Sequence, residues 1–175
     1  MSRGLRLIPI VLLVWLVIGL AWRLAKPADT AIPSQMVERQ VPQFALAPAV
    51  GGKPGLTAAD LATGRPRLVN IFASWCVPCV TEVKVLGELK RRGVSIDGIA
   101  VRDTPDALAA FLARNGDPYE RIGADRQSDL QIALGSSGVP ETFVIDGRGV
   151  IRRQYIGPLN EANIPGVLRE LRQSQ

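Results

Sequence analysis

The segment "FASWCVPCVTE" (residues 72–82) contains both cysteines of the 175-residue chain, separated by two residues. The run before it, "PRLVNIFAS" (66–74), is mostly apolar and is typical of a strand buried on both faces. After it, apolar residues recur at helical spacing as far as Gly93, a residue type that commonly ends helices. The segment therefore predicts a strand-to-helix junction, with Cys76 at the start of the helix and Cys79 one turn deeper.

Three kinds of site are open to this pair of cysteines. A structural zinc site needs four Cys or His ligands, whereas the chain has two cysteines and no histidine. A structural disulfide would close a very short loop and restrict the unfolded chain little. A redox pair fits best, because unpaired N–H groups at a helix N-terminus favour the thiolate, which is the attacking species. Cys76 is the candidate nucleophile, and Cys79 is placed to attack the mixed disulfide formed at Cys76.

Two neighbours of the cysteines are candidate supporting residues. Trp75 is expected to lie beside the sulfurs as an apolar contact, and the alternative is simple core packing. Glu82 lies on the same side of the predicted helix as Cys79, so it can exchange a proton with that thiol through water. The alternative for Glu82 is a solvated surface side chain.

The rest of the chain alternates between helical and strand patterns. The order predicted from residue 66 is strand, helix, strand, helix, helix, strand, strand, helix, which indicates an α/β fold with a mixed sheet and helices on both faces. After the cysteine-containing helix, the predicted elements are a strand (94–101), two helices (105–114 and 125–134), a hairpin (141–157) and a closing helix (160–173).

The N-terminus carries a run of sixteen residues without a charge, "LIPIVLLVWLVIGLAW" (7–22). A helix of that length reaches about 24 Å of a hydrocarbon core of roughly 30 Å, and flanking basic side chains can make up the difference. We predict an uncleaved membrane anchor over residues 1–25, a Pro-containing linker over 26–40 and one folded domain over 41–175. A cleaved secretory signal is the alternative, and both interpretations export the domain.

The charge pattern argues against nucleic-acid binding. The chain has a formal net charge of +5, but four of its 21 basic residues flank the apolar run. From residue 30 onward, 17 basic residues stand against 15 acidic ones, without a long basic run.

A family resemblance rests on two motifs. "NIFASWCVPC" resembles the thioredoxin superfamily, and "GVPETFVIDGRGVIRRQYIGPL" (138–159) is similar to the CcmG/DsbE type of cytochrome c biogenesis thiol-disulfide oxidoreductase. The resemblance covers residues 41–173 and implies a thioredoxin-like fold behind a single N-terminal transmembrane helix. The dipeptide between the cysteines, Val77-Pro78, departs from those common in the family.

The resemblance also implies roles for residues far from the cysteines. Pro140 takes the place of the superfamily's cis-proline facing the disulfide, where Val139 can present its backbone to a substrate strand. Glu141 is assigned, with Glu82, to an acidic patch near the site. Asn70 stands where ordinary thioredoxins carry a buried acid.

The function implied is a reductase in the periplasm, anchored in the bacterial inner membrane by a single span. It would keep the haem-binding cysteines of apocytochrome c reduced, directly or through a partner thiol protein, because an exported compartment oxidises such thiols. A membrane thiol-disulfide carrier of the DsbD or CcdA type would supply electrons. The protein is expected to act as a monomer, with no metal and no cofactor other than the Cys76–Cys79 disulfide. The alternatives are a general periplasmic reductase or oxidant, and a non-catalytic module that binds apocytochrome.

Overall fold

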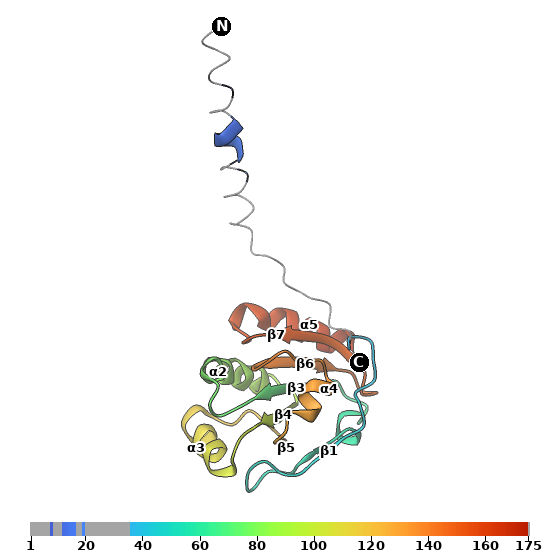
Figure 1. Ribbon diagram of the computed structural model, residues 1–175. Helices are drawn as coiled ribbons and strands as arrows, with labels where there is room; N and C mark the ends of the chain where they lie inside the picture. The colour runs from blue at the N-terminus through green and yellow to red at the C-terminus, as the bar shows by residue number, and fades with distance from the viewer. Residues whose placement is uncertain (1–7, 9–11, 17–18, 20–35, 175) are drawn as a thin grey trace. The chain divides into compact units, whose positions relative to one another are not determined.

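The computed structural model describes residues 8, 12–16, 19 and 36–174. Contacts divide the chain into two units, residues 1–32 and residues 33–175 (Figure 1). In the first unit, residues 12–16 are helical and their side chains are exposed. Within the part of the chain that is described, no helix is both long and apolar enough to cross a membrane. Most of the anchor predicted over residues 1–25 lies outside the described residues.

The second unit has an α/β fold built on a five-stranded mixed sheet of order β5-β4-β3-β6-β7. Strands β3, β4 and β5 are parallel, whereas β6 is antiparallel to both β3 and β7. The strands are β3 (Arg67–Phe72), β4 (Ile96–Val101), β5 (Ile122–Asp125), β6 (Glu141–Ile145) and β7 (Ile151–Ile156). The helices are α2 (Val77–Arg91), α3 (Pro105–Asn115), α4 (Asp129–Ala133) and α5 (Ile164–Gln173). The unit also contains two short strands, β1 (Ala45–Leu46) and β2 (Leu56–Thr57). It has two 3₁₀ turns as well, η1 (Ala59–Leu61) and η2 (Glu161–Asn163).

Helices α2 and α3 cover the same face of the central strand β3. The ring of Phe72 lies 6.0 Å from that of Phe111 in α3, and Asn70, on the same face, contacts Glu82 of α2. On the opposite face, Gly123 of β5 lies against the β1–β2 hairpin, and α4 lines a hollow together with that hairpin. The predicted arrangement of helices on both faces of a mixed sheet is therefore confirmed.

The ends of the α2 helix follow local rules. Cys76 is extended and acts as the N-cap, with its sulfur accepting from the backbone N–H of Cys79 at 3.2 Å, and Pro78 stands in the first turn. At the other end, Gly93 has a φ of 84° and the N–H of Val94 donates to the carbonyl of Leu89. The helix end predicted at Gly93 is confirmed.

The strand β5 was not predicted, and the helix predicted over 125–134 is shorter than expected. Ser128 has a left-handed φ of 65°, and α4 begins only after it. The strand itself has four residues and includes Gly123, a residue type that disfavours strands. A Cβ at Gly123 would lie 2.7 Å from the Cβ of Leu46, so glycine is required there by the packing of a hairpin that is distant in sequence.

The last residues of the segment predicted as a linker contact the folded unit. The N–H of Glu38 donates to the carbonyl of Ile151 at 2.7 Å, and the N–H of Ile151 donates to the carbonyl of Arg39 at 2.9 Å. Gln40 forms a bridge with Val150. The contacts of the domain thus extend to residues before 41.

The close packing at Gly123 gives a test of the fold. Replacing Gly123 with Ala forces a methyl group against the hairpin, so we expect the free energy of unfolding to fall by about 1–3 kcal/mol. Gly51→Ala is the matched control, because no atom lies within 4 Å of its added Cβ. Chemical denaturation of the purified protein measures both changes, and equal effects at the two positions would contradict the packing.

Candidate redox site

The two cysteines form a disulfide at the start of α2, directly after the central strand. The S–S distance is 2.00 Å and the Cα–Cα distance is 5.4 Å. Cys76 is 4% exposed and Cys79 is 1% exposed, so Cys76 is the more accessible residue of the two. The sulfur of Cys76 accepts from the backbone N–H of Cys79 at the N-terminus of α2, and such a donor favours a thiolate there after reduction.

Trp75 lies at the surface beside this disulfide. Its side chain is 54% exposed, and its indole N–H donates to the carbonyl of Arg102 at 3.3 Å. Core packing is therefore the wrong alternative for this residue. Asp103 supports the same turn, since it accepts from both the N–H and the hydroxyl of Ser74, the latter at 2.7 Å. The next residue, Thr104, caps α3.

Glu82 is buried behind the cysteines and is not a solvated surface side chain. It is only 1% exposed and lies one turn after Cys79 on α2. Its Oε1 accepts from the hydroxyl of Thr142 at 3.2 Å and from the N–H of Leu159 at 3.0 Å, and its Oε2 accepts from Nδ2 of Asn70 at 3.0 Å. Burial raises the pKa of Glu82, and the three hydrogen bonds oppose this effect in part.

A network of hydrogen-bonded polar side chains extends from Glu82 along one face of the sheet. The Nδ2 group of Asn70 also donates to the hydroxyl of Thr142 at 2.9 Å, and Oδ1 of Asn70 accepts from the hydroxyl of Tyr119 at 2.8 Å. All four side chains are buried. Sequence reasoning identified Glu82 and noted Asn70, but it missed Thr142 and Tyr119. Thr142 lies within the quoted family motif, whereas Tyr119 has no local signal.

The segment before β6 brings Pro140 to the same end of the sheet as the cysteines. The Val139–Pro140 peptide bond is cis, as the resemblance implied. Glu141 pairs with Ile71 in the β3–β6 ladder, so Pro140 lies beside the end of β3 from which the chain enters the Cys76 turn. Val139 is half-buried, and the carbonyl of Pro140 accepts from the N–H of Gly157 at 3.0 Å.

Glu141 does not form an acidic patch with Glu82. Both residues are 1% exposed, and adjacent residues of β6 point to opposite faces of the sheet, so Glu141 lies on the face opposite Thr142 and Glu82. Glu141 instead holds the loop before the cis-proline. Its Oε1 accepts from the N–H of Ser137 at 2.8 Å, the hydroxyl of Ser137 at 2.6 Å and the N–H of Gly138 at 3.1 Å.

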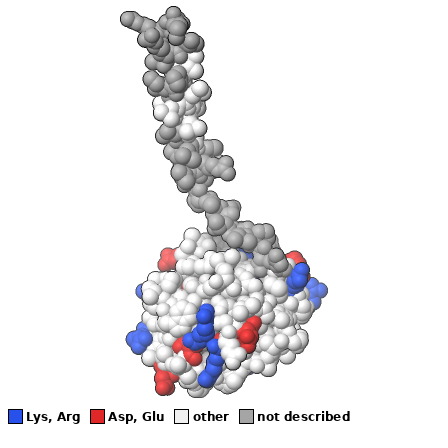
Figure 2. All heavy atoms as spheres, in the orientation of Figure 1, with Lys and Arg blue, Asp and Glu red and all other residues white. Residues whose placement is uncertain are grey.

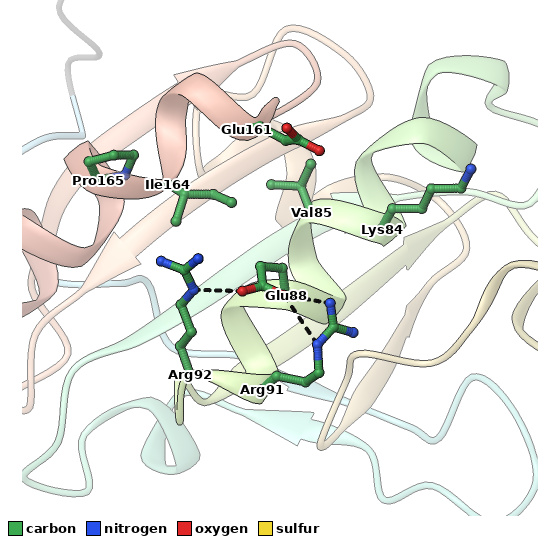
Figure 3. A pocket seen from close by; sticks show the side chains of 8 residues that line it. All are labelled: Lys84, Val85, Glu88, Arg91, Arg92, Glu161, Ile164 and Pro165. Atoms are coloured by element: carbon green, nitrogen blue, oxygen red, sulfur yellow. Dashed lines mark hydrogen bonds and ion pairs between the residues drawn. The ribbon is translucent and has the colours of Figure 1, made fainter.

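A hollow of about 510 Å³ between α2 and α5 lies outside this site (Figure 3). Within it, Glu88 accepts from the guanidinium groups of Arg91 and Arg92. The hollow is lined by Lys84, Val85, Glu88, Arg91, Arg92, Glu161, Ile164 and Pro165. On the face shown in Figure 2, basic and acidic side chains are interspersed.

A disulfide at this junction, opposite a cis-proline and backed by a buried carboxylate, defines a thiol-disulfide oxidoreductase of thioredoxin-like fold. The Redoxin family model matches residues 36–171, and the chain belongs to this family.

Relatives of this chain are thiol:disulfide interchange proteins. It is 38% identical over 161 residues to HelX of Rhodobacter capsulatus, with 92% of this chain and 91% of HelX covered. It is 40% identical over 162 residues to DsbE of Pseudomonas fluorescens biotype C, with 92% and 89% covered. The crystal structure of a thioredoxin-family thiol:disulfide interchange protein from Chlorobium tepidum TLS superposes with a TM-score of 0.58 at 28% identity, covering 77% of this chain and 94% of that one.

The burial of Glu82 predicts a pH dependence of stability. Because the pKa of Glu82 is raised in the folded state, its stabilising contribution is complete below the ordinary glutamate pKa of 4.5 and is lost as pH rises through the folded-state pKa. Glu82→Gln removes this loss, so the stability of the variant relative to the wild-type protein should increase from acidic to neutral pH. Denaturation of the oxidised protein across this range measures the difference.

Glu88 on the same helix is the matched control, because its pKa is shifted in the opposite direction. Hydrogen bonds from Arg92 and Arg91 lower the pKa of Glu88. Its contribution is present above the unfolded-state pKa and is lost as pH falls through the folded-state value. Glu88→Gln should therefore weaken the protein at neutral pH but not in acid. The same sign of pH dependence in both variants would contradict the burial argument.

Proposed function

We propose that the protein is a membrane-anchored periplasmic reductase that reduces disulfides in apocytochrome c, directly or through a partner thiol protein, during c-type cytochrome maturation. The observation that carries the proposal is the Cys76–Cys79 disulfide at the N-terminus of α2, beside the cis bond before Pro140. The relatives named HelX and DsbE support it, since they are thiol:disulfide interchange proteins. The Cys76–Cys79 pair is the redox centre, without a further cofactor.

Reduction of a substrate disulfide proceeds by two exchange steps. The Cys76 thiolate attacks one sulfur of the substrate disulfide, forming a mixed disulfide and releasing the other sulfur as a thiolate that takes a proton from solvent. Cys79 then loses its proton to Glu82 through water and attacks the sulfur of Cys76. The Cys76–Cys79 bond forms, and the second substrate sulfur leaves as a thiolate that takes this proton back from Glu82 through water. In total, two electrons and two protons pass to the substrate, and the protein changes from dithiol to disulfide.

Each surrounding group has a role in these steps. The N-terminus of α2 stabilises the Cys76 thiolate when it attacks the substrate disulfide. The backbone of Val139 offers hydrogen bonds to an extended substrate segment, and Trp75 provides an exposed apolar surface beside the sulfur. A membrane thiol-disulfide carrier of the DsbD or CcdA type restores the dithiol.

The N-terminal segment supports the proposed cellular location. Exposed apolar side chains over residues 12–16 suit lipid better than water, and the uncharged run of residues 7–22 has nearly the length of a single span. A single span in the bacterial inner membrane places the catalytic domain in the periplasm. There the domain acts as a tethered monomer.

Trapping the intermediate tests the exchange mechanism. Cys79→Ser removes the resolving thiol, so a mixed disulfide between Cys76 and a cysteine of the substrate should accumulate and survive non-reducing electrophoresis. Cys76→Ser is the matched control, since it retains one thiol but lacks the accessible nucleophile, and it should form no adduct. Equal adduct formation by the two variants would contradict the assignment of Cys76 as the nucleophile.

Complementation of a deletion strain tests the substrate. The proposal predicts that the strain lacks c-type cytochromes, and that the variant with both Cys76→Ala and Cys79→Ala fails to restore them. Normal cytochromes in the deletion strain would indicate a general envelope thiol reductase or oxidant. Restoration by the double variant would indicate a binding module without redox chemistry. Haem staining of membrane and periplasmic fractions separates these results.

A further inference from the structure

Tyr119 lies at the far end of the hydrogen-bonded chain that starts at Glu82. It belongs to the loop between α3 and β5, 49 residues from Asn70, whose Oδ1 accepts from its hydroxyl at 2.8 Å. Tyr119 is 1% exposed, and its ring stacks on that of Phe72 with centroids 4.5 Å apart. A Cβ at Gly98 would lie 3.1 Å from the same ring, so the ring is confined on this side as well.

The hydroxyl of Tyr119 determines which way the Asn70 amide faces. A buried amide presents one acceptor oxygen and two donor hydrogens. The oxygen is occupied by Tyr119, and the Nδ2 group therefore faces Oε2 of Glu82 and the hydroxyl of Thr142. Turning the amide over would leave the buried Tyr119 hydroxyl without its acceptor, which is costly.

This orientation leaves Glu82 surrounded by donors. Asn70, Thr142 and the N–H of Leu159 all donate to its carboxylate oxygens. A protonated Glu82 needs an acceptor for its own proton, but Oδ1 of Asn70 is turned toward Tyr119 and the hydroxyl of Thr142 is oriented to donate to Oε1 of Glu82. The network therefore favours the ionised carboxylate, which is the form able to accept a proton from Cys79.

We propose that Tyr119 is a positioning residue that fixes the Asn70 amide as a donor to Glu82 and so keeps Glu82 available as the proton acceptor for Cys79. The catalytic part of this inference rests on the function proposed above. Tyr119 itself touches neither the sulfurs nor the substrate and acts only through Asn70.

Few ionisable groups face this network. Cys79 precedes Glu82 on α2. Tyr119, in the α3–β5 loop, is connected to Glu82 through Asn70. Asp117 lies on the other side of Tyr119, where its carboxylate accepts from the backbone N–H of Tyr119 at 3.1 Å and pairs with Lys53. Burial, Glu82 and Asp117 together raise the pKa of Tyr119 well above 10.0, so its hydroxyl remains a donor throughout the working pH range.

Tyr119→Phe removes the hydroxyl and keeps the ring that packs on Phe72. The Asn70 amide can then turn and offer its oxygen to a protonated Glu82, so the pKa of Glu82 should rise by about one unit. Infrared spectroscopy of the protonated carboxyl group measures this shift in the oxidised protein, where no thiol titrates. Tyr155→Phe is the matched control, because Tyr155 is the only other tyrosine of the chain and, although it pairs with Thr142 across β6 and β7, its hydroxyl does not donate to Asn70 or Glu82.

A second measurement follows the resolving step. When the reduced protein reacts with an aromatic disulfide reagent, Cys76 first forms a mixed disulfide with the aromatic thiol. Cys79 then resolves this mixed disulfide and releases a coloured thiolate, and the rate of this second phase is independent of reagent concentration. In Tyr119→Phe, the midpoint of the pH dependence of this rate should move to higher pH by the same amount as the pKa of the Glu82 carboxyl group. Tyr155→Phe should leave both profiles unchanged.

The outcomes separate the two proposals. An unchanged carboxyl titration in Tyr119→Phe overturns the inference, whatever happens to the resolving step. A carboxyl titration that moves while the resolution profile stays fixed supports the positioning of Glu82 by Tyr119 and overturns the role of Glu82 as proton acceptor.

Asn70→Asp provides an independent variant if Tyr119→Phe does not fold. One oxygen of the new carboxylate still accepts from Tyr119, but the other faces Oε2 of Glu82, where Nδ2 of Asn70 lies 3.0 Å away in the wild-type protein. Two carboxylates at that distance must share a proton, so the titration of the pair should move upward further than in Tyr119→Phe. A titration unchanged from the wild-type protein would overturn the inference as well.

Discussion

The site depends on one buried carboxylate and the donors that surround it. Burying the charge of Glu82 without partners would be very unfavourable, and a protonated group could not accept a proton from Cys79. Three hydrogen bonds from Asn70, Thr142 and Leu159 make the ionised form accessible at this position. The remaining pKa elevation places the group nearer the pH at which a proton acceptor works well.

The fold brings these donors together from distant parts of the chain. Asn70 lies on β3, Thr142 on the neighbouring antiparallel strand β6, and Leu159 follows β7. The same strand pairing carries the cis peptide before Pro140 to the end of β3 where the Cys76 turn begins. The sheet order therefore sets both sides of the site: the proton acceptor behind the cysteines and the backbone beside them.

The local features were predictable from sequence, whereas burial and long-range contacts were not. A run of apolar residues predicts the strand before Cys76, and the conformational freedom of glycine predicts the end of α2 at Gly93. Both features are present in the structure. A glutamate on a helix is usually exposed, and the partners that bury Glu82 lie 12, 60 and 77 residues away. Glu141 was misplaced for the same reason, since its partners depend on the face of β6. Tyr119 carried no local signal, because its role exists only once the α3–β5 loop packs on β3.

The equilibrium reduction potential of the Cys76–Cys79 couple tests the central claim, that this pair donates electrons to its substrates. Titration of the purified protein against a dithiol buffer of known potential gives the value directly. The account predicts a potential close to that of reducing thioredoxins, about −270 mV, so that the dithiol is a net donor in the periplasm. A potential near that of a strong periplasmic oxidant, about −120 mV, would contradict it.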